Sequence, residues 1–139
     1  MPVKGELTSE AAIKDEFRSY QRAFKFILQA TSREEWEAIS EQRRQDLLVY
    51  LALGKYSGRP TIRKLAPEIK ADIKALFGSY KKACSLADQM LVHVEDMSQI
   101  AHLCTTSKIG KQLNNAIAIH ISALAKLPPL LRLYEGCAS

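Results

Sequence analysis

The chain has 139 residues, of which 47% are hydrophobic and 25% charged, with a formal net charge of +5. These values predict one globular domain with its own core, and they exclude a disordered chain or two domains of ordinary size. No apolar run approaches the roughly 20 residues that a bilayer requires, and residues 1–10 contain no signal-peptide core, so we expect a cytoplasmic protein without a membrane partner.

The first part of the chain has helical periodicity. Hydrophobic residues recur at three- and four-residue spacing over residues 9–29, which predicts one amphipathic helix. Ser32 and Glu35 have the spacing of a capping box. We therefore expect a short second helix over residues 33–40, with Ile39 facing inward.

A central helix follows. Residues 41–54 pass from a charged half to a nearly continuous apolar run and end on Gly54, a pattern typical of a helix surrounded by others. Residues 55–61 are predicted to form a loop because Gly58 and Pro60 break regular structure.

The segment after this loop predicts a helix, a sharp turn and another helix. Pro67 suits a first helical turn, Gly78 ends that helix, and Ser79 caps the next one. The first of these helices is expected to bury Ile69, Ile73, Leu76 and Phe77. A further short helix is predicted over residues 96–105.

The C-terminal tail, residues 106–139, has two interpretations. Ile117, Ile119 and Ile121 alternate as in a strand, whereas Leu113, Ile117, Ile121 and Leu124 fit one face of a helix. A lone strand is not stable without a partner, so a helix is favoured over residues 113–127, and a short strand near 116–121 is the alternative. Two prolines then break the chain before a last helix at residues 130–136.

An internal repeat defines the fold class further. The stretch "IKDEFRSYQRAF" at residues 13–24 aligns without gaps on "IKALFGSYKKAC" at 73–84, with six of twelve positions identical. We predict an all-α fold, a compact helical bundle with two helix-turn-helix-like hairpins in a single domain over residues 1–139. The two copies span about residues 2–28 and 60–88.

The first copy departs from the second at the turn. Arg18 stands where the second copy has Gly78, and a side chain disfavours the backbone conformation of a sharp turn. We therefore expect the first copy to run as one continuous helix and to serve structure rather than binding.

The positive charge is concentrated in the second copy. Residues 54–82 carry eight basic and two acidic side chains, whereas the rest of the chain is nearly balanced. Concentrated positive charge attracts polyanions such as DNA, and a helix N-terminus favours phosphate; a solvated basic face without a partner is the alternative. The predicted nucleic-acid contacts are Arg59, Arg63, Lys64, Ser79, Lys81 and Lys82.

The sequence predicts neither a catalytic site nor a cofactor. No Gly-rich nucleotide-binding loop is present. The histidines at 93, 102 and 120 lack the spacing of metal ligands. Cys84, Cys104 and Cys137 form no C-x-x-C pair, so we expect reduced thiols that are buried or half-buried.

The second copy resembles the small helical repeat that accompanies HNH-type and homing endonucleases. That repeat starts with Gly-Arg-x-Pro and continues to Phe-Gly-Ser-aromatic and an alanine. The matching residues here are Gly58, Arg59, Pro60, Phe77, Gly78, Ser79, Tyr80 and Ala83. Because those repeats are thought to contact DNA, the resemblance implies the same for this hairpin.

A wider resemblance covers nearly the whole chain. The stretches "PVKGEL", "FKFILQATSREEWEAISEQRRQDLLVYLAL", "LFGSYKKACSLAD" and "SKIGKQLNNAIAIHISALAKLPPLLRLYEGCA" resemble the middle section of the bacterial DNA phosphorothioation-associated methyltransferases. In that family a Rossmann-like domain with a cofactor motif precedes this section. No counterpart of that motif is present, so no methyltransferase site is carried over.

The resemblance implies a non-catalytic, DNA-binding accessory module of a DNA modification system. Such a module is either a separate small protein or a fragment of the larger enzyme. The alternative is an interaction scaffold that docks on a modification enzyme through its apolar C-terminal tail. Ala118 stands where the family tends to have an aromatic residue, which puts the packing of that tail in question.

Overall fold

The computed structural model describes residues 8–114 and 116–138, so the start of the first repeat copy lies outside the described residues. The elements are α1 (Glu10–Phe17), α2 (Tyr20–Ala30), α3 (Arg33–Leu53), η1 (Ile62–Lys64), α4 (Pro67–Phe77), α5 (Tyr80–Val94), α6 (Met97–Thr106), β1 (Lys111–Leu113), β2 (Ala116–Ala118), η2 (Ile121–Lys126) and α7 (Pro129–Ala138). The predicted all-α fold with a short strand is confirmed. Among the described helices, none combines the length and apolarity that a bilayer crossing requires.

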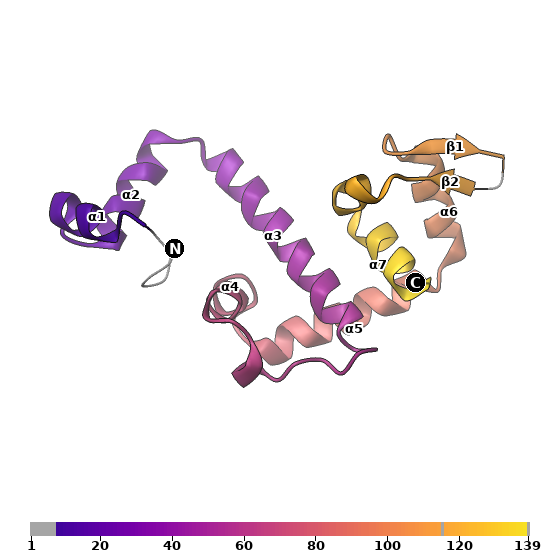
Figure 1. Ribbon diagram of the computed structural model, residues 1–139, viewed down its shortest axis with the longest axis horizontal. Helices are drawn as coiled ribbons and strands as arrows, with labels where there is room; N and C mark the ends of the chain where they lie inside the picture. Colours follow the sequence, from indigo (N-terminus) through magenta and orange to yellow (C-terminus); the bar gives the residue numbers. More distant parts are fainter. Residues whose placement is uncertain (1–7, 115, 139) are drawn as a thin grey trace.

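The long helix α3 connects the two ends of the molecule (Figure 1). The α1–α2 hairpin lies at its N-terminal end, and α4, α5 and α7 gather around its C-terminal end. The prediction of a separate short helix over residues 33–40 was wrong. Residues 40–42 contain neither proline nor glycine, so nothing interrupts helix propagation there.

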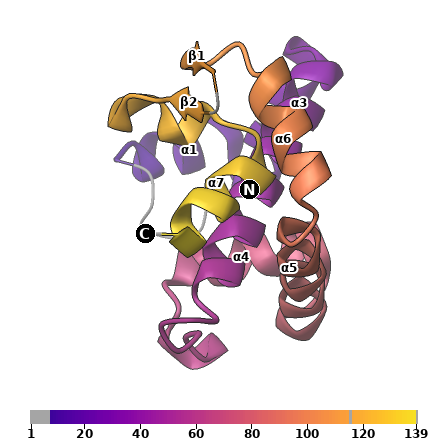
Figure 2. The ribbon, with the colours of Figure 1, turned by 90° about the vertical axis from the view of Figure 1, so that its right-hand side faces the viewer.

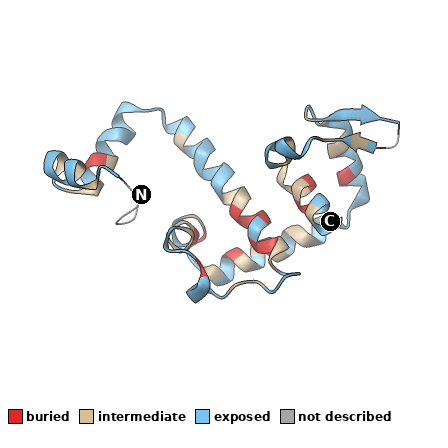
Figure 3. Ribbon diagram, viewed as in Figure 1, coloured by how far each residue is buried: buried red, intermediate tan, exposed pale blue. Residues whose placement is uncertain are grey.

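The main core surrounds the C-terminal half of α3, where the buried residues concentrate (Figure 3). Leu51 of α3, Ile73 and Phe77 of α4 and Leu133 of α7 are buried there, as the sequence predicts for the two α4 residues. Helix α7 approaches α3 closely because residue 136 is a glycine. A Cβ on Gly136 would lie 2.7 Å from a methyl carbon of Leu53.

A smaller core lies under the tail, where Ile100 of α6 packs with Leu127 and Leu131. Strand β1 pairs with β2 in an antiparallel hairpin, with Gln112 opposite Ile117. Figure 2 shows this hairpin beside α6 and α7. The prediction of a helix over residues 113–127 was therefore wrong, because the short exposed segment 111–113 supplies the strand partner that sequence reasoning missed.

The two repeat copies share one joint geometry. Helix α1 ends at Phe17, Arg18 adopts a left-handed conformation with φ of 60°, and the Ser19 hydroxyl accepts a hydrogen bond from the Arg22 amide. In the second copy Gly78 has φ of 79°, and Ser79 caps α5 in the same way. The expected continuous helix in the first copy was wrong. A Ser cap contributes about as much free energy, roughly 1 kcal/mol, as a left-handed residue costs, so the arginine does not prevent the turn.

Two further predictions at the start of α3 were wrong. Ser32 does not form a capping box with Glu35; its hydroxyl instead donates to Glu34 at 2.6 Å. Ile39 is exposed rather than inward, because no other helix of the described residues covers this half of α3 on that side. The N-terminal half of α3 is thus a solvated connector and its C-terminal half a core helix.

Candidate nucleic-acid interface

The turn of the second hairpin, beside Ser79, Lys81 and Lys82, is held by contacts with the core and with the preceding loop. Phe77 is only 4% exposed, and the Arg44 guanidinium of α3 lies 5.3 Å from its ring centroid. The Tyr80 hydroxyl donates to the carbonyl of Pro60, and its burial, together with Cys84, raises the pKa of Tyr80 to about 12. The loop before η1 is therefore tied to the first turn of α5.

Arg59 lies inside this hairpin rather than on its surface. Its side chain is 16% exposed and donates from Nε to the carbonyl of Leu51 and from a terminal nitrogen to Asp88, both at 2.8 Å. Lys55 also pairs with Asp88, at 3.3 Å. The hydrogen bond from Arg59 lowers the pKa of Asp88. Arg59 therefore links the loop to α3 through Leu51 and to α5 through Asp88, whose carboxylate neutralises its charge.

The other predicted cations are exposed on the second repeat copy. Arg63 and Lys64 lie in η1, and Lys81 and Lys82 lie in the first turn of α5. None of the four forms an ion pair with an acidic side chain of the described residues. The segment that carries Arg63 and Lys64 is bonded to Tyr80 through the carbonyl of Pro60 and to the first turn of α4 through Lys70.

Ser79 has a local role at this turn. Its Oγ accepts the Lys82 amide at 3.2 Å and so caps α5. Serine at this position satisfies one of the free amides of the helix start. The hydroxyl proton remains available as a donor, as a phosphate oxygen would require.

Two lysines of α4 extend the basic surface beyond the predicted residues. Lys74 is exposed in the last turn of α4, and Lys70, one turn earlier, donates from Nζ to the Arg63 carbonyl at 3.1 Å. Their four-residue spacing within the basic segment 54–82 is the sequence signal that could have identified them.

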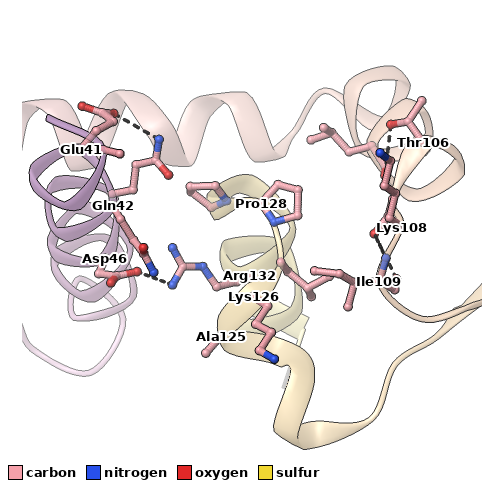
Figure 4. Close-up of a pocket in the computed structure, with 16 residues that line it drawn as sticks. Glu41, Gln42, Asp46, Thr106, Lys108, Ile109, Ala125, Lys126, Pro128 and Arg132 are labelled. Atoms are coloured by element: carbon pink, nitrogen blue, oxygen red, sulfur yellow. Dashed lines mark hydrogen bonds and ion pairs between the residues drawn. The ribbon is translucent and has the colours of Figure 1, made fainter. Parts of the chain in front are cut away.

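A separate cleft of about 750 Å³ lies between α3, the end of α6 and the start of α7 (Figure 4). Arg132 extends across it to Asp46 with a 2.6 Å ion pair. Lys108 and Lys126 line the cleft opposite Glu41 and Asp46. Its walls thus carry both signs of charge, which favours structural pairing over binding of a polyanion.

The thiols and imidazoles are scattered over the described residues. Cys84 and Cys104 are half-buried free thiols, as expected, whereas Cys137 is exposed, so that part of the prediction was wrong. No group of three or more His, Cys, Asp or Glu side chains in the described part of the chain could hold a metal ion. The basic turn is therefore the surface with the clearest chemical character.

Comparisons of this chain with protein families, with curated proteins and with solved structures find no match. Its function must therefore be argued from its own residues and geometry.

Proposed function

We propose that this protein is a non-catalytic DNA-binding accessory module of a DNA modification system, related to the phosphorothioation-associated methyltransferases that its sequence resembles. The observation that carries the proposal is the set of four exposed cations in the second repeat copy, Arg63, Lys64, Lys81 and Lys82, without ion pairs among the described residues.

The chemistry of this surface suits a phosphate backbone. Long, unpaired cations release condensed counterions when they neutralise phosphates, which drives binding that depends on salt rather than on base sequence. The first turn of α5 adds free backbone amides and the positive end of the helix dipole. Arg59 supports the surface indirectly, because it fixes the loop that leads to η1.

The test is fluorescence anisotropy of the full chain on duplex DNA at several salt concentrations. We expect the logarithm of the binding constant to fall linearly with the logarithm of salt concentration. The double variant Lys81→Glu/Lys82→Glu should weaken binding to all sequences alike and reduce the slope by about 0.9 for each phosphate that the variant no longer neutralises.

The control is Lys108→Glu/Lys111→Glu, which makes the same charge change at β1 and in the loop before it; Figure 1 shows β1 away from α4 and the start of α5. Equal effects of the two double variants would show that only net charge matters, and the proposed surface would then be wrong. Binding of the unmodified chain without any salt dependence would equally rule out a phosphate-binding surface.

A scaffold function is the second candidate, and one pocket favours it. A pocket of about 530 Å³ lies between the β-hairpin, α6 and α7, with Met97, Leu113 and Ile117 in its walls. Ile121 beyond the hairpin is 77% exposed. These apolar side chains are available to a protein partner.

The scaffold function is tested by point substitution, because removal of the tail would take Leu133 out of the main core. We expect Leu113→Asp/Ile121→Asp to reduce co-purification with a phosphorothioation-associated methyltransferase and to leave DNA affinity unchanged. Unchanged co-purification would remove this candidate.

A further inference from the structure

Helix α5 has one continuous exposed face. Its buried side carries Ala83 and Ala87, which pack in the main core, and the next side, with Tyr80 and Asp88, is bonded to the loop after α3. The side chains that remain cover roughly a third of the helix circumference, at about 100° per residue. We call them the outer face of α5; they are Lys81, Lys82, Ser85, Gln89, Val92 and His93, all exposed.

The outer face carries no negative charge. Asp88 is the acidic residue of α5, and it lies at the loop, where both Arg59 and Lys55 pair with it. Two cations on one carboxylate leave a surplus positive charge beside the outer face. Lys81 and Lys82 form no ion pair with a described residue. A polyanion can therefore approach along α5 without repulsion from any side chain of this face.

Beyond the two lysines, the outer face carries groups that suit bases rather than phosphates. Neither the Ser85 hydroxyl nor the Gln89 amide bonds to another described residue, so both are available as donors and acceptors. A glutamine amide can form two hydrogen bonds to one adenine in the major groove, and serine can bond to several bases. Val92 is 66% exposed, and an apolar side chain there can contact the methyl group of thymine.

The dimensions of α5 suit a major groove, which is wide enough to admit an α-helix. Lys81 and Val92 lie about 16 Å apart along the helix axis at 1.5 Å per residue, which corresponds to roughly five base-pair steps. Together with Ser85 and Gln89 they line one hollow of about 460 Å³. In helix-turn-helix proteins the second helix of the hairpin lies in the groove, and Figure 2 shows α5, the second helix here, at one edge of the molecule.

We propose that the outer face of α5 lies in the major groove of duplex DNA and recognises base sequence, with Gln89 bonded to an adenine and Val92 against a nearby thymine methyl group. This inference rests on the proposed DNA-binding function and adds to it an affinity term that depends on sequence. Gln89 and Val92 are three residues apart and therefore neighbours on the helix surface, so their contacts fall on adjacent base pairs. Ser85, one turn nearer the lysines, is the second polar group that contacts a base.

Selection of duplexes from a random DNA library by the full chain, followed by sequencing, tests the proposal. We expect an enriched motif of a few adjacent base pairs that includes an adenine. Gln89→Ala should reduce the preference for that adenine roughly tenfold and leave the salt dependence unchanged, because it removes no charge. Gln29→Ala is the matched control: Gln29 is the counterpart of Gln89 sixty residues earlier and is exposed on α2. It should leave the motif unchanged.

Two further measurements separate the outer face from other modes of binding. Val92→Ser should reduce the preference for thymine at the neighbouring base pair without changing the adenine position. Duplex RNA of the selected sequence should bind no better than a scrambled RNA duplex, because side chains cannot reach the bases in its deep and narrow major groove. A preference that persists in RNA would contradict recognition in the major groove.

Failure of this inference can be distinguished from failure of the proposed function. A chain that binds no duplex at all overturns both. Salt-dependent binding without an enriched motif retains the phosphate-binding surface and overturns base recognition by α5. A motif that Gln89→Ala leaves intact, or that Gln29→Ala alters equally, also overturns it.

Discussion

The two hairpins of this molecule share a sequence pattern and a joint but differ in what covers them. The α4–α5 hairpin lies against α3 and α7 and contributes Ile73, Phe77 and Ala83 to the main core. The α1–α2 hairpin stands at the far end of α3, mostly exposed (Figure 3). The comparison shows that the turn is determined by the local sequence, whereas the burial of each hairpin depends on which other helices pack against it.

The largest expected difference between the hairpins is in the matched pair Phe77→Ala and Phe17→Ala. Phe77 is enclosed by the core, so its truncation should lower the free energy of unfolding by about 3–5 kcal/mol. Phe17 is half-buried and packs on Phe26 at 5.8 Å between centroids, so we expect about 1 kcal/mol. Urea unfolding measures both, and equal losses would mean that the first hairpin is also part of the core.

The comparison also shows how far sequence reasoning reaches. Helices with clear periodicity and punctuation, such as Pro67 to Gly78, were predicted with their ends. The errors came where two local rules gave different answers. At Arg18 the turn forms beside the Ser19 cap although the glycine is absent. At residues 111–118 two three-residue strands pair with each other. Neither competition is visible in periodicity.

The candidate site was predictable only in part for a similar reason. The charge count located Lys81 and Lys82 correctly on an exposed turn. It could not show that Arg59 turns inward to Asp88, because that pairing joins residues 29 positions apart. Long-range ion pairs follow from tertiary packing, and a single sequence does not reveal them.

The next largest effect should come from Arg59, whose bonds have no counterpart among the described residues of the first hairpin. Arg59→Met retains an apolar stem but removes the donors to Leu51 and Asp88. We expect a loss of about 2 kcal/mol in unfolding free energy. If thermal and urea unfolding are unchanged, Arg59 is free for a ligand, and the predicted contact role would gain support.

The ion pair between Arg59 and Asp88 should make the free energy of unfolding depend on pH. The pKa of Asp88 is lowered in the folded chain by the hydrogen bond from Arg59, so its contribution is present above the ordinary carboxyl pKa. It is lost as pH falls through the lowered folded value. Asp88→Asn should therefore be less stable than the parent chain at neutral pH, and the gap should narrow on acidification. A gap that is constant with pH, measured by urea unfolding, would contradict the pairing.

A smaller, opposite pair of effects is expected at the turns. In Gly78→Ala the added methyl group has room, since nothing lies within 4 Å of it. The φ of 79° nevertheless strains an alanine, so we expect the free energy of unfolding to fall by roughly 1 kcal/mol. Arg18→Gly relieves φ of 60° in the first hairpin and should raise its helix content and its amide protection. Loss of protection in Arg18→Gly would show that the arginine side chain itself holds the turn.

The smallest effect should come from the two caps, which are locally alike. The Ser19 and Ser79 hydroxyl oxygens each accept a hydrogen bond, at 3.2 Å, from the backbone amide three residues later in the chain. Each alanine variant should therefore lower the stability of its own helix by about 1 kcal/mol. Global unfolding should register this only for Ser79→Ala, because α5 is part of the main core. In Ser19→Ala the loss should appear as faster amide exchange confined to residues 20–30, since local opening of that hairpin leaves the core intact. Faster exchange in α5 of the Ser19→Ala variant would mean that the two hairpins unfold together, and the distinction drawn from their burial would fail.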